Sequence, residues 1–277
     1  MTYKTILVHL DHRPRSTERL GLACSLADEF DAHLVGLFAP GGPRLPSYAA
    51  AEGGPVLRDL LEERRKEVLR EVQRRFREVA QRNGGERSEW RTADFDPAAA
   101  MRLSARYADL VVAGQPEDEE EGELRGLADE LAFSAGRPVL FVPYAGRFAA
   151  LGKRVLVAWD AGREAARAVT DALPLLKRAE AVEVCAFDPE RGRRGHGELP
   201  GADVGLFLAR HGVKVTVARQ SGARYDVGSQ VLSRAADIGA DLIVMGAYGH
   251  TRVREMVLGG VTRTMLEAMT VPVLMSH

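Results

Sequence analysis

Several features that restrict what a protein can do are scarce in this sequence. Only two of its 277 residues are cysteines, Cys24 and Cys185, and each lies within an apolar run, so we expect small core residues in a reducing cytoplasm rather than a disulfide. No apolar run approaches the roughly 20 residues that span a membrane, and the first residues do not resemble a targeting segment. The formal net charge of −1 gives no field that would attract nucleic acid or an anionic membrane, so neither is expected as a partner.

Groupings of catalytic or metal-binding residues are also missing. The seven histidines show no metal-ligand spacing with one another or with cysteine, and no Ser-His-Asp or paired-carboxylate arrangement stands out. We therefore expect no metal-binding residues and no catalytic residues. A dedicated enzyme is not the expected function.

What the sequence does contain is a repeated alternation of short apolar runs with helical patterns. The run at residues 4–11 is followed by helical spacing, by a second run at 33–38, and by a long amphipathic segment at 57–83. The same landmarks return in the same order in the second half, from an apolar run at 153–160 to a terminal Pro-Val-Leu run at 271–275. This repetition indicates an internal duplication.

The type of strand then indicates the fold class. Strands that are apolar throughout and are separated by helices belong to parallel sheets covered on both faces. We therefore predict an α/β protein with two tandem, doubly wound, five-stranded parallel-sheet domains of the Rossmann-like kind. The expected domains are residues 1–144 and 153–277, joined by a linker at about 144–152.

The clearest functional signal lies in the stretch 245–262, between an apolar run and a helical pattern. Gly246 and Gly249 fall where a strand must turn and let its backbone approach a ligand. Gly259–Gly260 precede the helix, where unpaired N–H groups and the helix dipole favour an anion. The stretch predicts a phosphate-binding loop at the switch point of the second sheet, where Asp160 would also lie.

The spacing from Gly246 to Gly249 and on to Gly259 resembles the nucleotide-binding signature of the universal stress protein family, G-x2-G-x9-G followed by Ser or Thr. An aspartate after the first strand and a terminal Pro-Val-Leu strand occur in both halves, so the chain resembles the tandem, two-domain form of that family. The resemblance implies binding of ATP or another adenine nucleotide, with or without Mg²⁺.

The resemblance also assigns residues to the nucleotide. Asp160 matches the aspartate that contacts the nucleoside, and Ala158 and Ala186 match the strand ends that bound the adenine. The ribose and phosphates correspond to Met245, Gly246, Gly249, His250, Gly259, Gly260, Val261 and Thr262. Gly260 departs from the family pattern, which has Ser or Thr there, and the missing hydroxyl would weaken phosphate binding by about 0.5 to 1.5 kcal/mol.

The corresponding loop of the first half is acidic. After Gly114 come Gln-Pro and a run of acids at 117–123, with Glu117 in place of the second glycine. A triphosphate there would face charges of its own sign. We therefore predict a degenerate first domain and a single nucleotide site in the second.

Assembly is predicted from the last strand of each half. In the family this strand commonly pairs two domains, and here residues 137–143 and 271–275 could pair within one chain, which would satisfy two otherwise exposed edges. The chain would then be an intramolecular pseudo-dimer. A homodimer of chains remains a second arrangement.

The favoured function is an ATP-binding regulatory or sensor module of the stress response, with at most slow hydrolysis. One alternative is an interaction scaffold that binds no nucleotide, in which the glycine loop is only a tight connection and Asp160 is only a helix N-cap. Another is an adenine-nucleotide hydrolase, although no catalytic base is visible. The basic segment 191–196 could be a lid over phosphates or a surface loop.

Overall fold

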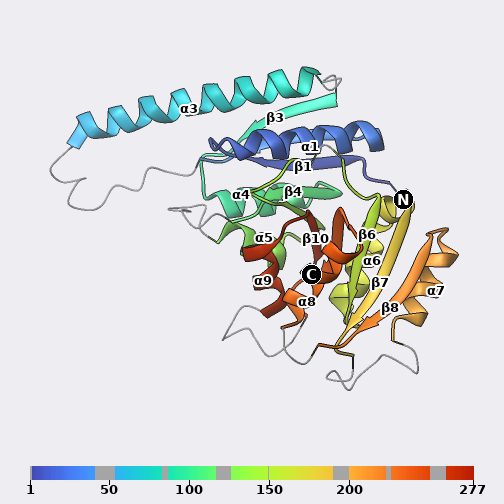
Figure 1. Cartoon of the computed structure of the whole chain (residues 1–277). Helices are drawn as coiled ribbons and strands as arrows, with labels where there is room; N and C mark the ends of the chain where they lie inside the picture. Colours follow the sequence, from blue (N-terminus) through green and yellow to red (C-terminus); the bar gives the residue numbers. More distant parts are fainter. Residues whose placement is uncertain are drawn as a thin grey trace.

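The chain has two similar halves, whose sheets join edge to edge in the middle of one continuous sheet (Figure 1). The computed structural model describes residues 2–40, 54–82, 87–116, 126–148, 150–189, 200–222, 226–249 and 260–277. Within these ranges the strands form a ten-stranded sheet in the order β3-β2-β1-β4-β5-β10-β9-β6-β7-β8. The blue-to-green half occupies the upper part of Figure 1, and the yellow-to-red half occupies the lower part.

The N-terminal half alternates strands and helices from the first described strand onward. Its elements are β1 (Thr5–Leu10), α1 (Arg15–Phe30), β2 (His33–Phe38), α3 (Gly54–Arg82), β3 (Ser88–Thr92), α4 (Pro97–Ala105), β4 (Leu110–Gly114), α5 (Leu127–Ser134) and β5 (Val139–Val142).

The C-terminal half repeats this succession. Its elements are β6 (Arg154–Trp159), α6 (Arg163–Leu176), β7 (Ala181–Phe187), α7 (Ala202–Arg210), β8 (Val215–Gln220), α8 (Val227–Asp237), β9 (Leu242–Gly246), α9 (Gly260–Ala268) and β10 (Val273–Ser276).

The two halves share one topology. The order β3-β2-β1-β4-β5 of the first half is matched by β8-β7-β6-β9-β10 in the second, and all pairs within a half are parallel. In each half the winding reverses beside the first strand, between β1 and β4 and between β6 and β9. The predicted α/β class, the parallel sheets and the duplication are confirmed.

The halves are joined by their last strands. β5 and β10 pair antiparallel, with Phe141 opposite Val273 and Val139 opposite Met275. All four side chains are buried, so the join removes two apolar edges from water. The predicted pairing of these two strands within one chain is confirmed.

Helices cover both faces of the continuous sheet. One apolar cluster lies under α1, α3, α6 and α7, and the other lies under α4, α5, α8 and α9. Cys24 and Cys185 are both buried and unpaired, as expected. Among the described helices none is both long enough and apolar enough to cross a membrane.

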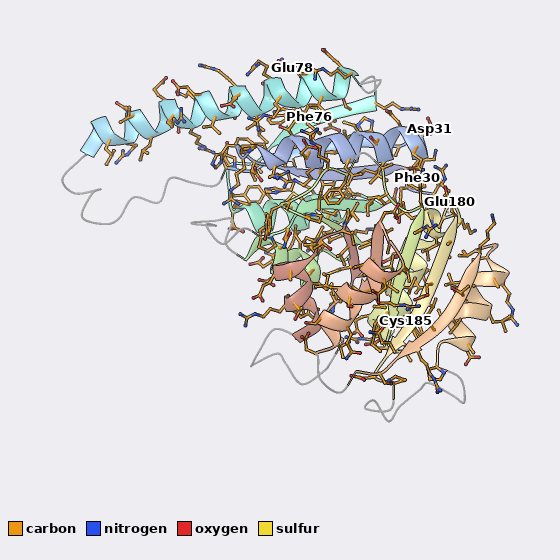
Figure 2. The ribbon with its side chains drawn as sticks, viewed as in Figure 1. Phe30, Asp31, Phe76, Glu78, Glu180 and Cys185 are labelled. Carbon is orange, nitrogen blue, oxygen red and sulfur yellow. The ribbon has the colours of Figure 1, made fainter. Side chains whose placement is uncertain are left out.

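The helix α3 illustrates how an amphipathic pattern positions an element. Its buried residues Val72 and Phe76 face the sheet, and the Phe76 ring lies 5.6 Å from the ring of Trp90 on β3. Figure 2 shows Phe76 on the sheet side of the helix and Glu78 on the opposite side. The first turns of α3 extend beyond the rest of the chain (Figure 1).

Three details differ from the sequence pattern. The helix α7 was not predicted, and β8 begins at Val215 rather than at residue 213. α9 begins at Gly260, which the sequence pattern places before the helix. This last difference matters for the site, because it places Gly260 in the helical turn whose N–H groups have no intrahelical partners.

Candidate functional site

The candidate site lies at the carboxyl ends of β6 and β9, where the winding of the second sheet reverses. Ala158 of β6 is paired with Met245 of β9, so the residues that follow each strand start from the same edge of the sheet. Asp160 comes directly after β6, and Gly246 ends β9. In open α/β sheets this is the place where ligands bind.

Asp160 is directed toward the glycine loop. One carboxylate oxygen accepts a hydrogen bond from the backbone N–H of Gly162 at 2.8 Å. The other oxygen lies 3.4 Å from the position that a Cβ on Gly249 would occupy. The N-cap of α6 is Gly162, not Asp160, so the interpretation of Asp160 as that helix's N-cap is wrong. Its carboxylate is exposed and available to a ligand.

The two described glycines of the loop have different roles. A Cβ on Gly246 would lie 2.6 Å from the backbone nitrogen of Ala165 and 2.7 Å from the carbonyl carbon of Glu164. Glycine is therefore needed at 246 so that the first turn of α6 can pack against the end of β9. Among the described residues, a Cβ on Gly249 would touch only the carboxylate oxygens of Asp160 and Glu164, both at 3.4 Å. Position 249 is open to the exterior.

Glu164 belongs to the site although its sequence position did not reveal it. Its side chain is only 5% exposed and pairs with Arg163. Burial raises the pKa of Glu164, but the hydrogen bond and charge of Arg163 outweigh burial and hold the pKa below its usual range. A second carboxylate, kept ionised by Arg163, therefore lies next to Gly249 together with that of Asp160. Its signal in the sequence is an acid on the same helical face as Ala168, within an apolar stripe.

Thr262 fixes the backbone that follows Gly246. It is buried, and its hydroxyl oxygen accepts the backbone N–H of Tyr248 at 3.2 Å. The preceding backbone N–H, that of Ala247, donates to the carbonyl of Ser276 at 2.8 Å. Thr262, which the resemblance places in the turn around the phosphates, thus also fixes the backbone between Gly246 and Gly249 through its hydroxyl.

The three apolar candidates differ in access. The side chains of Met245 and Ala186 are buried, so only their backbone groups could contact a ligand. Ala158 is half-buried and lies on the face that carries α8 and α9. The structure brings Ala158, but not the side chain of Ala186, to the α9 side of the sheet.

The first turn of α9 is the part of the candidate site whose backbone could hold an anion. Gly260 is exposed, and a Cβ there would meet no other described residue within 4 Å. Val261 and Thr262 follow it in the turn, where backbone N–H groups lack intrahelical partners. Arg263 pairs with Glu267 at 2.6 Å on the exposed side of the helix. His250, Gly259 and the basic segment 191–196 lie outside the described residues.

The N-terminal half has a similar arrangement at the carboxyl ends of β1 and β4, but a side chain occupies the space beside its aspartate. Asp11 accepts the backbone N–H of Arg13 at 2.8 Å, as Asp160 does with Gly162. However, Arg19 from α1 donates to the other oxygen of Asp11 at 2.8 Å and to the carbonyl of His9 at 2.8 Å. A Cβ on Gly114, the counterpart of Gly246, would collide with the Arg19 guanidinium. Arg19 therefore occupies the space beside the switch point of the first sheet.

Burial and the charge of Arg19 shift the pKa values of Asp11 and of the neighbouring His9. Burial raises the pKa of Asp11, but the adjacent Arg19 outweighs burial and lowers the pKa to about 2. His9 is also buried, and burial followed by the charge of Arg19 lowers its pKa to about 4. The His9 Nε2 atom has no hydrogen-bond partner among the described residues. Each half thus places an aspartate after its first strand. Among the described residues Asp160 is exposed and pairs with no cation, whereas Asp11 is buried against Arg19.

Within the described ranges no group of three or more His, Cys, Asp or Glu side chains is placed to hold a metal ion. Asp160 and Glu164 supply two carboxylates near Gly249, so a cation would need further oxygens from a ligand.

Comparison with known proteins finds a family similarity in the second half of the chain. Residues 152–277 match the model of the universal stress protein family. No sequence among the curated proteins matches the chain. Among solved structures, a universal stress protein from Archaeoglobus fulgidus is similar over 98% of this chain and 95% of that chain, with 19% identity and a TM-score of 0.73. A protein from Pseudomonas aeruginosa described as a "putative universal stress protein" is similar over 99% of this chain and 93% of that chain, with 18% identity and a TM-score of 0.57. These likenesses establish a shared fold.

Proposed function

Because residues 152–277 match the universal stress protein family, we propose that the chain binds an adenine nucleotide, ATP in the first place, at one site in that half. The adenine and ribose would lie at the ends of β6 and β7, near Ala158 and the carboxylate of Asp160. The phosphates would lie over the loop that starts at Gly246 and against the first turn of α9.

The observation that carries this proposal is the contrast between Asp160 and Asp11. Both follow the first strand of their half and both accept a backbone N–H two residues later. Asp160 is exposed and points to Gly249, whereas Asp11 is buried against Arg19. This contrast favours one nucleotide per chain, with residues 1–144 as a degenerate domain and 153–277 as the binding domain.

The charges at the base of the loop favour a nucleotide that carries Mg²⁺. One oxygen of Asp160 and one of Glu164 each lie 3.4 Å from the position that a Cβ on Gly249 would occupy. The distance between these two oxygens is therefore at most twice that value. Two carboxylates would repel a bare triphosphate, and a cation shared between them and the phosphate oxygens would remove that repulsion. Binding of ATP is therefore expected to be tighter with Mg²⁺ than with a chelator present.

A regulatory or sensor role in the stress response suits this site better than rapid turnover. Glu164, the buried acid nearest the loop, is held ionised by Arg163 and has its pKa lowered, which makes it a weak general base. Slow hydrolysis at most is expected. Turnover faster than about 1 per second that survives purification would favour the hydrolase alternative instead.

Calorimetry with Mg·ATP tests the proposal. Asp160→Ala should weaken binding by roughly ten- to a hundredfold, because it removes a charged hydrogen-bonding group. Asp96→Ala is the matched control: Asp96 is also an exposed aspartate that accepts a backbone N–H at 2.8 Å, but it caps α4 in the other half. Equal affinities of the two variants would place the nucleotide elsewhere, and no binding of ATP, ADP or AMP at millimolar concentration would leave the scaffold alternative.

A further inference from the structure

Tyr248 lies in the middle of the glycine loop and has an unusual backbone conformation. Its φ is +55°, a left-handed value that a bulky residue adopts only when its surroundings hold it there. The backbone N–H of Tyr248 is fixed by Thr262 from its own half. The side chain is fixed by the other half of the chain.

The contact with the N-terminal half is made by α5. The Tyr248 hydroxyl donates a hydrogen bond of 2.9 Å to a carboxylate oxygen of Asp129, in the first turn of α5. The Tyr248 ring packs on that of Phe133, one turn farther along α5, in a T-shaped arrangement with ring centres 5.8 Å apart and planes at 79°. Burial, and then the charge of Asp129, raise the pKa of Tyr248 above its usual value, so the phenol stays a hydrogen-bond donor.

His277 completes this arrangement. Its ring stacks obliquely on Phe133 at 4.7 Å, and its Nδ1 atom lies 3.0 Å from the carbonyl oxygen of Ala247. Ala247 and Tyr248 are the two residues between Gly246 and the exposed Gly249. Both are therefore tied to a surface that α5 contributes.

We propose that Tyr248 is a positioning residue through which the N-terminal half sets the conformation of the nucleotide loop. The half that has lost its own site thereby completes the site of the other half, since the turn between Gly246 and Gly249 is held by Asp129 and Phe133. As to the ligand, this inference rests on the proposed function. A change in α5 alters the affinity for nucleotide, and bound nucleotide in turn stabilises α5, because coupling between two sites is reciprocal.

The first experiment measures hydrogen exchange of the amides of Ala247, Tyr248 and Gly249 in the protein without nucleotide. Asp129→Ala should speed their exchange, because the loop loses its anchor. Glu130→Ala is the matched control, since Glu130 is the other acid in the first turn of α5 and is exposed. Unchanged exchange in Asp129→Ala, or equal acceleration in both variants, would overturn the inference.

The second experiment measures Mg·ATP affinity in a double-mutant cycle. Tyr248→Phe and Asp129→Ala should each weaken binding by roughly three- to tenfold, and the double variant should bind no more weakly than either single one. Tyr3→Phe removes another hydroxyl that links the halves, bonded to the carbonyl of Asp171 at 2.7 Å on the other face of the sheet, so it should lower stability without lowering affinity. Additive losses, or an equal loss in Tyr3→Phe, would refute a specific role for Tyr248.

The two experiments separate this inference from the proposed function. If the wild-type protein binds no nucleotide, the proposed function fails, while the exchange of the loop amides still decides whether α5 holds the loop. If nucleotide binds but Asp129→Ala changes neither the exchange of the loop amides nor the affinity for nucleotide, the proposed function stands and the inference fails.

Discussion

Replacement of Gly260 by serine should strengthen nucleotide binding. Gly260 is the first residue of α9 as the structure describes it and is exposed, and a Cβ at this position would meet none of the other described residues within 4 Å. Serine therefore fits without strain and places a hydroxyl at the helix end where the phosphates are expected. One added hydrogen bond contributes about 0.5 to 1.5 kcal/mol, which is about two- to twelvefold in affinity.

The control for this prediction is Gly260→Ala. Alanine adds the same Cβ and restricts the unfolded chain to a similar extent, so both variants should gain up to about 1 kcal/mol of folding stability. Only serine adds a hydrogen-bonding group. Calorimetry with Mg·ATP on wild type and both variants isolates the hydroxyl, and serine binding no tighter than alanine would refute the placement of phosphate at the first turn of α9.

Three further predictions concern stability. Gly246→Ala should lose about 1 to 3 kcal/mol in urea unfolding because its Cβ would press on the backbone of α6, whereas Gly249→Ala should lose less than about 1 kcal/mol; equal losses would contradict the packing described. Arg19→Ala should lose about 3 to 5 kcal/mol by leaving Asp11 buried without its cation, and fluorescence-monitored unfolding that shows a loss under about 1 kcal/mol would contradict this. The pKa of buried His9 is lowered from 6.5 to about 4, so between these pH values the unfolded state binds a proton that the folded state does not. The free energy of unfolding should therefore fall by up to about 3 kcal/mol as the pH drops through this window. Urea midpoints measured at each pH test this, and His9→Gln should reduce the pH dependence.

The fold was predictable because its signals are local. The apolar runs of β1, β4, β6 and β9 are short, lack alternation and are separated by helical patterns, and these are properties of neighbouring residues. The pairing of β5 with β10 was predictable for another reason: the repeat left each half with one apolar last strand that needed a partner. α7 was missed, since its nine residues expose Leu206 and Phe207 and show only a narrow apolar stripe.

The site was predictable only in part. The positions of Asp160 and Gly249 relative to the strands follow from the topology, because both lie just past the carboxyl ends of neighbouring parallel strands. The roles of Arg19 and Tyr248 do not, because they depend on side chains that meet across helices. Tyr248 and Asp129 are separated by 119 positions in the chain, and no local pattern relates two such residues.

The most direct test of the central claim is to count bound nucleotides. Native mass spectrometry or equilibrium dialysis of the full chain with saturating Mg·ATP should give one nucleotide per chain, and Asp160→Ala should reduce that count at the same concentration. A count of two would show that Arg19 does not close the first site, and a count of zero at millimolar nucleotide would contradict the account.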